Sequence, residues 1–232
     1  MSDLALTDEL FFTRAGLDRS RVETIVNDAL HGADDGELFL EYCQSESVVL
    51  EDGKIRNASY DTSQGFGLRA VPGEVSGYAH ASDLSEAAMK RAADTVRAVH
   101  AGHGGTFADA PALTNRSLYS DQNPLGSYSF EDKVKLLREI DAYARAKDSR
   151  VSQVSASIAG EWQAVQIVRP GGLHVADIRP LVRLNVSVVV AQGDRMESGG
   201  HGVGGRQDFS LYVAPDAWKA QVDEALRQAV LN

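Results

Sequence analysis

Histidines are the residues of this sequence whose type could support metal catalysis. Catalytic zinc sites commonly place two histidines one helical turn apart, with a glutamate between them as general base. No histidine here precedes a glutamate, and only His100 and His103 are near each other, across a helix end and a Gly-rich loop. We interpret this pair as solvated loop residues, with half a metal site as the alternative. The sequence therefore predicts no catalytic residue and no metal ligand. The six histidines are His31, His80, His100, His103, His174 and His201.

Motifs for a nucleophile or a nucleotide are equally weak. A Gly-x-Ser-x-Gly elbow and a P-loop are both absent from the sequence. Cys43 falls within an expected strand without a neighbouring base, which is typical of a small apolar filler. Gly200, Gly202 and Gly205 match Gly-x-Gly-x-x-Gly, but residues 206–213 read as a strand or loop and not as the helix that a dinucleotide site needs.

A glycine-rich run at 197–206 has five glycines in ten residues. Glycine permits the close approach of another backbone, as well as φ values closed to other residues. Two interpretations stay open: a loop or edge strand that lies against a peptide ligand or a partner domain, and a mobile surface loop. The candidate substrate-binding residues are Gly199, Gly200, Gly202, Gly204, Gly205 and Arg206.

Three arginines, Arg179, Arg183 and Arg195, lie in or beside the strand with the cleanest alternation. Arginine can hold a carboxylate through two parallel hydrogen bonds. Contact with a substrate terminus or with another domain is one interpretation. Ordinary charge on a sheet surface is the one that we favour.

Helices are predicted at four places along the chain. Capping boxes at Ser20/Glu23 and Asp83/Glu86 precede a helix at 21–30 and another that ends before 101–105. Ser129 caps a third helix over about 130–147, and a fourth starts near Pro215. The third helix has the apolar stripe Phe130, Val134, Leu137, Ile140 and Ala144, and the fourth has Trp218, Val222, Ala225, Leu226 and Ala229.

Alternation with period 2 predicts two antiparallel blocks of strands. The first is a four-stranded meander, with an Asp52-Gly53 hairpin turn and its last strands at 64–71 and 74–81. The second has strands near 154–162, 173–178 and 182–190. The predicted fold class is α+β, with antiparallel β-meanders flanked by helices, because strands do not alternate singly with helices. We expect one domain over 1–232, with two sub-blocks at 1–105 and 129–232 joined by an irregular linker.

Composition narrows the class of protein. The formal net charge is −10, which disfavours direct nucleic-acid binding. One cysteine cannot form an internal disulfide, which fits a reducing cytoplasm. The first ten residues lack the basic region of a signal peptide, and no apolar run reaches the roughly 20 residues of a membrane span. We therefore expect a cytoplasmic protein with no membrane partner.

Several stretches resemble the N-terminal domain of the TldD/PmbA family, and the TldD branch more closely than the PmbA (TldE) branch. The resemblance covers almost all of the chain and depends on the order of the stretches, since none is a catalytic signature. The stretches are 49–55, 64–71, 76–80, 118–119, 124–125, 177–190 and the glycine-rich run that ends in Arg206.

This resemblance implies a cytoplasmic zinc metallopeptidase with a second, C-terminal domain that carries a His-Glu-x3-His motif. That motif is missing here, so zinc is expected in the missing domain and no metal ligand is carried over. The implied partners are a TldD-type catalytic domain, a PmbA/TldE-like subunit in a heterodimer, and unfolded peptide substrates. This chain then resembles an excised domain, a truncated product or half of a split protein.

Three functions remain after these observations. The leading one is a substrate-guiding and assembly domain of a zinc peptidase that is inactive alone. The second is a non-catalytic interaction module that modulates gyrase or a toxin–antitoxin system. The third is a small-molecule-binding enzyme that uses the glycine-rich run.

Overall fold

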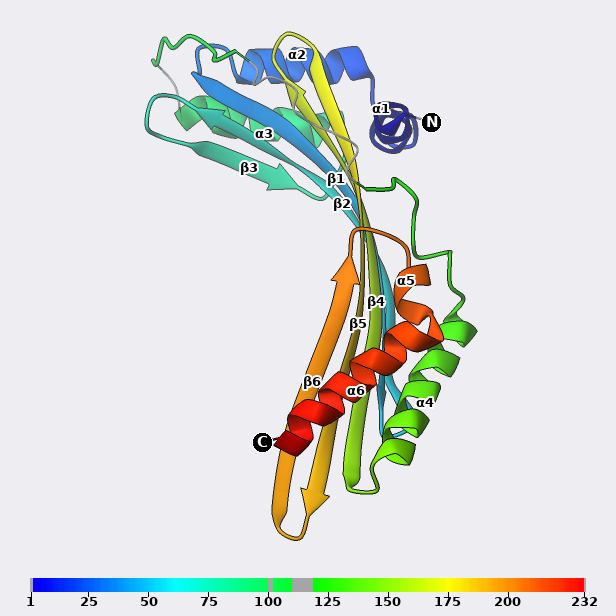
Figure 1. Ribbon diagram of the computed structural model, residues 1–232. Coiled ribbons are helices and arrows are strands. Elements are labelled where there is room, and N and C mark those ends of the chain that lie inside the picture. The colour runs from blue at the N-terminus through cyan, green and yellow to red at the C-terminus, as the bar shows by residue number, and fades with distance from the viewer. Residues whose placement is uncertain (1, 100–101, 110–118, 232) are drawn as a thin grey trace. The chain divides into compact units, whose positions relative to one another are not determined.

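The computed structural model describes residues 2–99, 102–109 and 119–231. Its strands form one six-stranded antiparallel sheet with the order β3-β2-β1-β4-β5-β6 (Figure 1). This sheet confirms the predicted α+β class. Strands that follow one another in the sequence are neighbours within β1–β3 and within β4–β6, as in two antiparallel meanders. The strands are β1 (Asp35–Glu51), β2 (Lys54–Val71), β3 (Gly77–Ala81), β4 (Val151–Arg169), β5 (Leu173–Gln192) and β6 (Arg195–Gly205).

Helices precede, separate and follow the two groups of strands. Helix α1 and the π-helical turn after it were not predicted, because the capping residue Ser2 is followed three positions later by Ala5 and not by the Glu or Gln of a capping box. None of the described helices is long and apolar enough to span a bilayer. The helices are α1 (Asp3–Asp8), η1 (Glu9–Thr13), α2 (Arg19–Ala29), α3 (Glu86–Val99), α4 (Phe130–Lys147), α5 (Ser210–Val213) and α6 (Pro215–Leu231).

The chain forms two compact units that are not contiguous in sequence. Four strands, β1, β2, β4 and β5, contribute residues to both units. The division into sub-blocks at 105 and 129 stays a prediction. Unit 1 comprises Met1–Cys43, Thr62–Leu118 and Gln163–Ile178, and unit 2 comprises Gln44–Asp61, Tyr119–Trp162 and Arg179–Asn232.

In unit 1, α2 packs against α3, and α3 packs against β3. The predicted cap of α2 was wrong: the Asp18 carboxylate accepts a hydrogen bond from the Arg21 backbone N–H at 3.0 Å, so the helix begins at Arg19. At α3, the Ser85 hydroxyl accepts from the Ala88 N–H at 3.2 Å, between the two residues of the predicted capping box. A nearby Asp or Ser therefore took the capping role in both helices. The α2 residues that enter the core are the expected Val22, Ile25, Val26 and Ala29.

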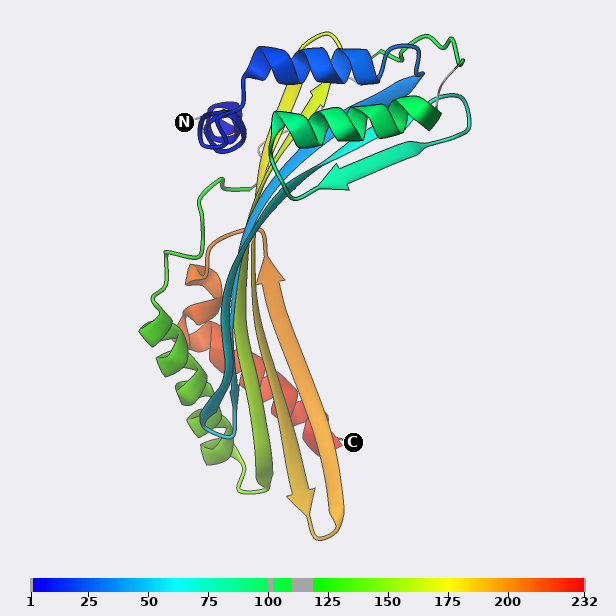
Figure 2. The same cartoon turned by 180° about the vertical axis from the view of Figure 1, so that it is seen from behind.

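In unit 2, α4 and α6 lie on one face of the sheet, and Figure 2 shows the opposite face without a described helix over it. The buried stripe of α6 and the Ser129 cap of α4 are confirmed. The stripe of α4 was partly wrong, since Lys133 and Leu136 are buried and Phe130 is exposed. Lys133 pairs with Glu46 of β1, which is why a charged residue can enter this face.

Two strands are longer than the alternation predicted. β2 is continuous from Lys54 to Val71, so the first group of strands is a three-stranded meander, β1–β3, where four strands were expected. β5 likewise runs through Pro180, just before its pairing with β6 begins at Val182. Alternation breaks where both sides of a strand are exposed, as they are over most of β2, although the backbone still pairs. The short helix α5 replaces the strand or loop expected after Arg206.

Candidate functional site: a glycine-rich edge strand

The glycine-rich run forms β6, the last strand in the sheet order (Figure 2). One side of β6 pairs with β5, in a register that joins Gln192 to Arg195 and Val182 to Gly205. The five candidate glycines lie within this strand and Arg206 follows it. The run is therefore an edge strand and not a surface loop, whereas its contact with a peptide ligand or a partner domain stays a prediction. Substrate binding by these residues stays a prediction.

The two faces of β6 differ, because alternate residues of a strand point to opposite sides of the sheet. Gly199 is buried beneath α6, and Nδ1 of His201 shares a hydrogen bond with Oε1 of Gln221 on that helix. Gly200, Gly202 and Gly204 are exposed on the other face, and we call them the exposed glycines.

Close packing explains the glycines at both ends of the run. A Cβ on Gly199 would clash with the backbone of α6 at Ala225, and a Cβ on Gly204 would clash with the carbonyl oxygen of Val182. Both clashes involve backbone atoms, which cannot rotate away as a side chain can. These two positions therefore need glycine for the fold itself.

Gly200 differs from its neighbours. A Cβ there would meet only ordinary contacts, the nearest being the Val186 carbonyl oxygen at 3.6 Å. At Gly202 the space is filled by the Asn185 side chain, which would have to move. The described part of the fold thus gives no steric reason for glycine at position 200, and this leaves room for a contact from outside the chain.

The exposed glycines also direct their backbone groups outward. Gly193 and Asp194 form a two-residue turn, with Gly193 at φ +62°, between the paired residues Gln192 and Arg195. A two-residue hairpin closes on a pair that exchanges both hydrogen bonds, and such pairs then alternate along the strands. Counting from Arg195, the residues that bond to β5 are on the α6 side of β6. The exposed glycines consequently present their N–H and C=O groups to the free edge.

The remaining candidate residues sit at the end of the strand. A Cβ on Gly205 would lie 2.8 Å from the Tyr212 hydroxyl oxygen, so glycine is favoured there by α5. The guanidinium of Arg206 lies 5.3 Å from the ring centroid of Tyr119, a cation–π contact. Arg206 therefore has a partner within unit 2.

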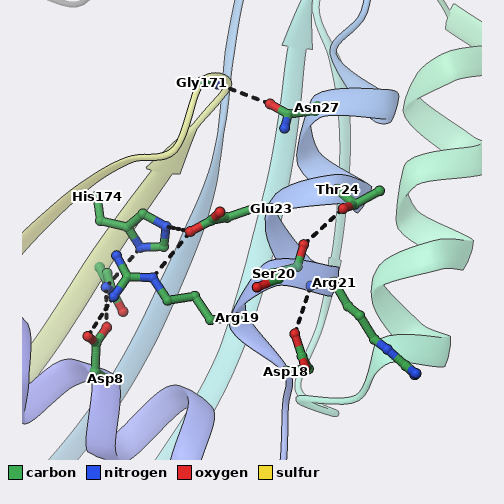
Figure 3. Close-up of polar contacts among 11 residues, drawn as sticks. Asp8, Asp18, Arg19, Ser20, Arg21, Glu23, Thr24, Asn27, Gly171 and His174 are labelled. Carbon is green, nitrogen blue, oxygen red and sulfur yellow. Dashed lines mark hydrogen bonds and ion pairs between the residues drawn. The ribbon is translucent and has the colours of Figure 1, made fainter.

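A second polar cluster was not predicted from the sequence. Figure 3 shows His174 of β5 beside Glu23 and Arg19 of α2, with Asp8 at the end of α1. The imidazole Nε2 lies 2.9 Å from Glu23 Oε1, and Arg19 pairs with Asp8 at 2.8 Å. Glu23 and His174 are 151 positions apart, so no local pattern could connect them.

His174 in this cluster is buried and neutral. Its side chain is 2% exposed, and burial, with the nearby Arg19 charge, lowers its pKa despite the opposing effect of Glu23 and Asp8. Its Nε2–H therefore donates to Glu23, while Nδ1, 3.2 Å from Gln166 Nε2, accepts. A His–carboxylate pair can act as a base, but the burial of His174 keeps substrate away. The cluster instead anchors α2 to the β4–β5 hairpin.

The described histidines do not fit a catalytic zinc site. Within residues 2–99, 102–109 and 119–231, no three His, Cys, Asp or Glu side chains are grouped as metal ligands. His103 Nε2 lies 3.0 Å from Asp34 Oδ2, and its expected companion His100 is outside the described residues. Cys43 is half-buried in β1. We therefore assign no chemical step to these side chains.

Two family models match most of the chain. Residues 36–100 match domain 1 of the PmbA/TldA metallopeptidases, and residues 123–232 match their central domain. The chain belongs to the TldD/PmbA metallopeptidase family. The resemblance noted in the sequence is thereby confirmed, since all of its stretches except 118–119 lie within the matched residues.

Relatives in the TldD/PmbA family are much longer than this chain. It is 37% identical over 206 residues to the metalloprotease TldD homolog of Haemophilus influenzae, covering 86% of this chain and 43% of that protein. It is 32% identical over 238 residues to the metalloprotease TldD homolog of Buchnera aphidicola from Schizaphis graminum, covering 99% and 49%. The chain thus spans less than half the length of the curated relatives that it matches.

Solved structures share the fold of this family member. TldE from Thermococcus kodakarensis aligns with a TM-score of 0.65 at 16% identity, over 90% of this chain and 47% of that one. A proposed modulator of DNA gyrase from Bacteroides thetaiotaomicron aligns with a TM-score of 0.70 at 17% identity, over 91% and 49%. At these identities the likeness concerns the fold.

Proposed function

We propose that this chain is the substrate-guiding and assembly part of a TldD-like zinc metallopeptidase that cleaves peptides, and that it is not catalytic by itself. The observation that carries the proposal is the free edge of β6, where three exposed glycines present backbone groups without side chains to cover them. Zinc would be held by a segment outside these residues. A PmbA/TldE-like subunit would complete a cytoplasmic heterodimer.

Strand addition explains how such an edge could select substrates. An extended peptide can pair its backbone with an exposed strand and so lengthen the sheet. A folded protein has already paired its backbone groups and cannot offer them. The edge of β6 would therefore admit unfolded segments of many sequences and exclude folded domains. Natural sheets usually protect such edges with charged residues or proline, and the stretch from Ser198 to Gly205 has neither.

The test compares two substitutions at the position where the fold tolerates a side chain. Gly200→Pro removes the outward N–H, whereas Gly200→Ala keeps it, and both leave the β5 side of the strand paired. We expect Gly200→Pro to weaken binding of a fluorescein-labelled, amidated peptide of alternating threonine and valine by about tenfold, and Gly200→Ala to bind as wild type. Fluorescence anisotropy with the 232-residue chain measures both.

Stability measurements separate binding from folding. Urea denaturation should show Gly200→Ala within about 1 kcal/mol of wild type. Gly199→Ala, one residue away, should destabilise the chain by about 1–3 kcal/mol because its Cβ clashes with α6. Unchanged peptide affinity in a folded Gly200→Pro variant would show that the peptide does not pair with β6.

A further inference from the structure

Arg183 lies on the same open face of the sheet as the exposed glycines. It pairs with Gly204 across the strands, and its guanidinium extends along β6, because a Cβ built on Gly202 would lie 3.5 Å from one of its terminal nitrogens. The missing side chain at Gly202 is what lets the guanidinium occupy this place. A positive charge is thus held above the strand that has the free edge.

Neighbouring side chains orient Arg183 without neutralising it. Its Nε–H donates to Asn185 Oδ1 at 2.8 Å, and Asn185 Nδ2 donates to Ser157 Oγ at 3.3 Å. In the described part of the chain this is the one side-chain hydrogen bond of Arg183, and no carboxylate pairs with it. Its terminal nitrogens therefore keep donors for a ligand from outside.

Two other arginines of unit 2 show the contrast. Arg56 Nε lies 3.0 Å from Glu51, and Arg195 Nε lies 2.9 Å from Glu197. Arg183 differs from both, because in the described part of the chain no carboxylate lies within ion-pair distance of its guanidinium. On the β6 side, Gly204 lies opposite Arg183 and Gly202 lies beside its guanidinium, and neither residue has a side chain to cover it.

We propose that Arg183 binds a carboxylate carried by the peptide that docks on β6. The inference rests on the proposed function and names the class of peptide: one with an acidic side chain or a free C-terminus at the register of Gly202. A strand added to β6 would lie about 4.8 Å from it, within reach of a guanidinium that already covers β6. Arginine suits this role because its planar group can donate two parallel hydrogen bonds to a carboxylate.

Three peptides test the proposal and distinguish the two sources of the carboxylate. All alternate threonine and valine: the first has a central glutamine and an amidated end, the second a central glutamate and an amidated end, and the third the glutamine and a free C-terminus. Wild type should bind the second, the third or both about tenfold more tightly than the first, as expected for a charge-assisted pair. The peptide that gains affinity identifies the source.

Two matched variants assign the preference to a residue. Arg183→Gln should lose the tenfold preference and bind the neutral peptide within twofold of wild type. Arg56→Gln removes the same charge from the same side of the sheet, since its neighbour Ile55 packs against the core, and it should keep the preference. Equal affinity of wild type for all three peptides, or a preference that survives in Arg183→Gln, would overturn the proposal.

The two proposals fail in different ways. If no peptide binds, or if Gly200→Pro does not weaken binding, strand addition at β6 is wrong and the role of Arg183 falls with it. If peptides bind and Gly200→Pro weakens them, but charge has no effect, only the role of Arg183 is wrong.

Discussion

At the scale of single residues, His174 shows how a titratable group can serve the fold and not the chemistry. Its imidazole lies between Glu23 and Gln166, with the Phe12 ring 6.2 Å away, and burial keeps it neutral. In the unfolded chain a histidine has a pKa of about 6.5. Because the folded chain binds this proton less readily than the unfolded chain, acid favours unfolding.

The prediction follows from this difference in proton binding. The contribution of His174 should be fully present above about pH 6.5 and decline as the pH falls toward its lowered folded-state pKa. His174→Gln should unfold more easily at pH 7.5, by about 1–2 kcal/mol, and should lack this loss of stability between pH 6.5 and 5. Thermal unfolding of both proteins across the range measures it. Parallel pH profiles would contradict a buried, neutral His174.

At the scale of elements, α4 is attached to β1 by a buried ion pair. Lys133 is 2% exposed, and its Nζ contacts Glu46, the Leu125 carbonyl oxygen at 3.3 Å and the Phe209 ring at 5.0 Å from the centroid. Hydrophobic spacing had assigned Phe130 to this side, although it is exposed, whereas Val134 packs against the core as predicted. The pair therefore sets which face of α4 is turned toward the sheet.

Removing one partner should be worse than removing both. Lys133→Ala leaves the Glu46 carboxylate, whose side chain is only 16% exposed, without a counter-charge and should destabilise the chain by about 3 kcal/mol, whereas Lys133→Met with Glu46→Leu should recover most of that. Ser129→Ala, which removes only the cap of the same helix, should cost about 1 kcal/mol. Urea denaturation compares the three. A double variant no more stable than Lys133→Ala would show that the pair acts by more than charge compensation.

At the scale of the whole molecule, the chain offers a sheet with a free edge and lacks a described cluster of metal ligands. Binding and catalysis would then be divided between this chain and another segment of a longer protein. Under the proposed function, this division would account for a candidate site made of backbone groups and one arginine without a described ion pair.

The purified chain should therefore bind peptides without cleaving them. With equimolar zinc added and unbound metal removed by dialysis, we expect well under one zinc ion per chain by metal analysis, and no cleavage of the threonine–valine peptides by mass spectrometry. Stoichiometric zinc that disappears on substitution of the chain's own histidines would contradict the proposed division.

Local physics determined much of this molecule from the sequence. The period-3.6 stripe of α6, the Ser129 cap of α4 and the alternation of β5 depend on residues a few positions apart, and these were predicted correctly. The α+β class followed from the same patterns. The edge-strand interpretation of the glycine-rich run was also available, although sequence could not choose it over a loop.

Tertiary structure decided what depends on distant neighbours. Gly199 and Gly200 are adjacent and identical in type, yet only the packing of α6 makes one of them structural. His174 meets Glu23 across 151 positions, and Lys133 is buried only because Glu46 reaches it from another strand. Burial and charge pairing are properties of the folded arrangement, so a pattern along the chain cannot contain them.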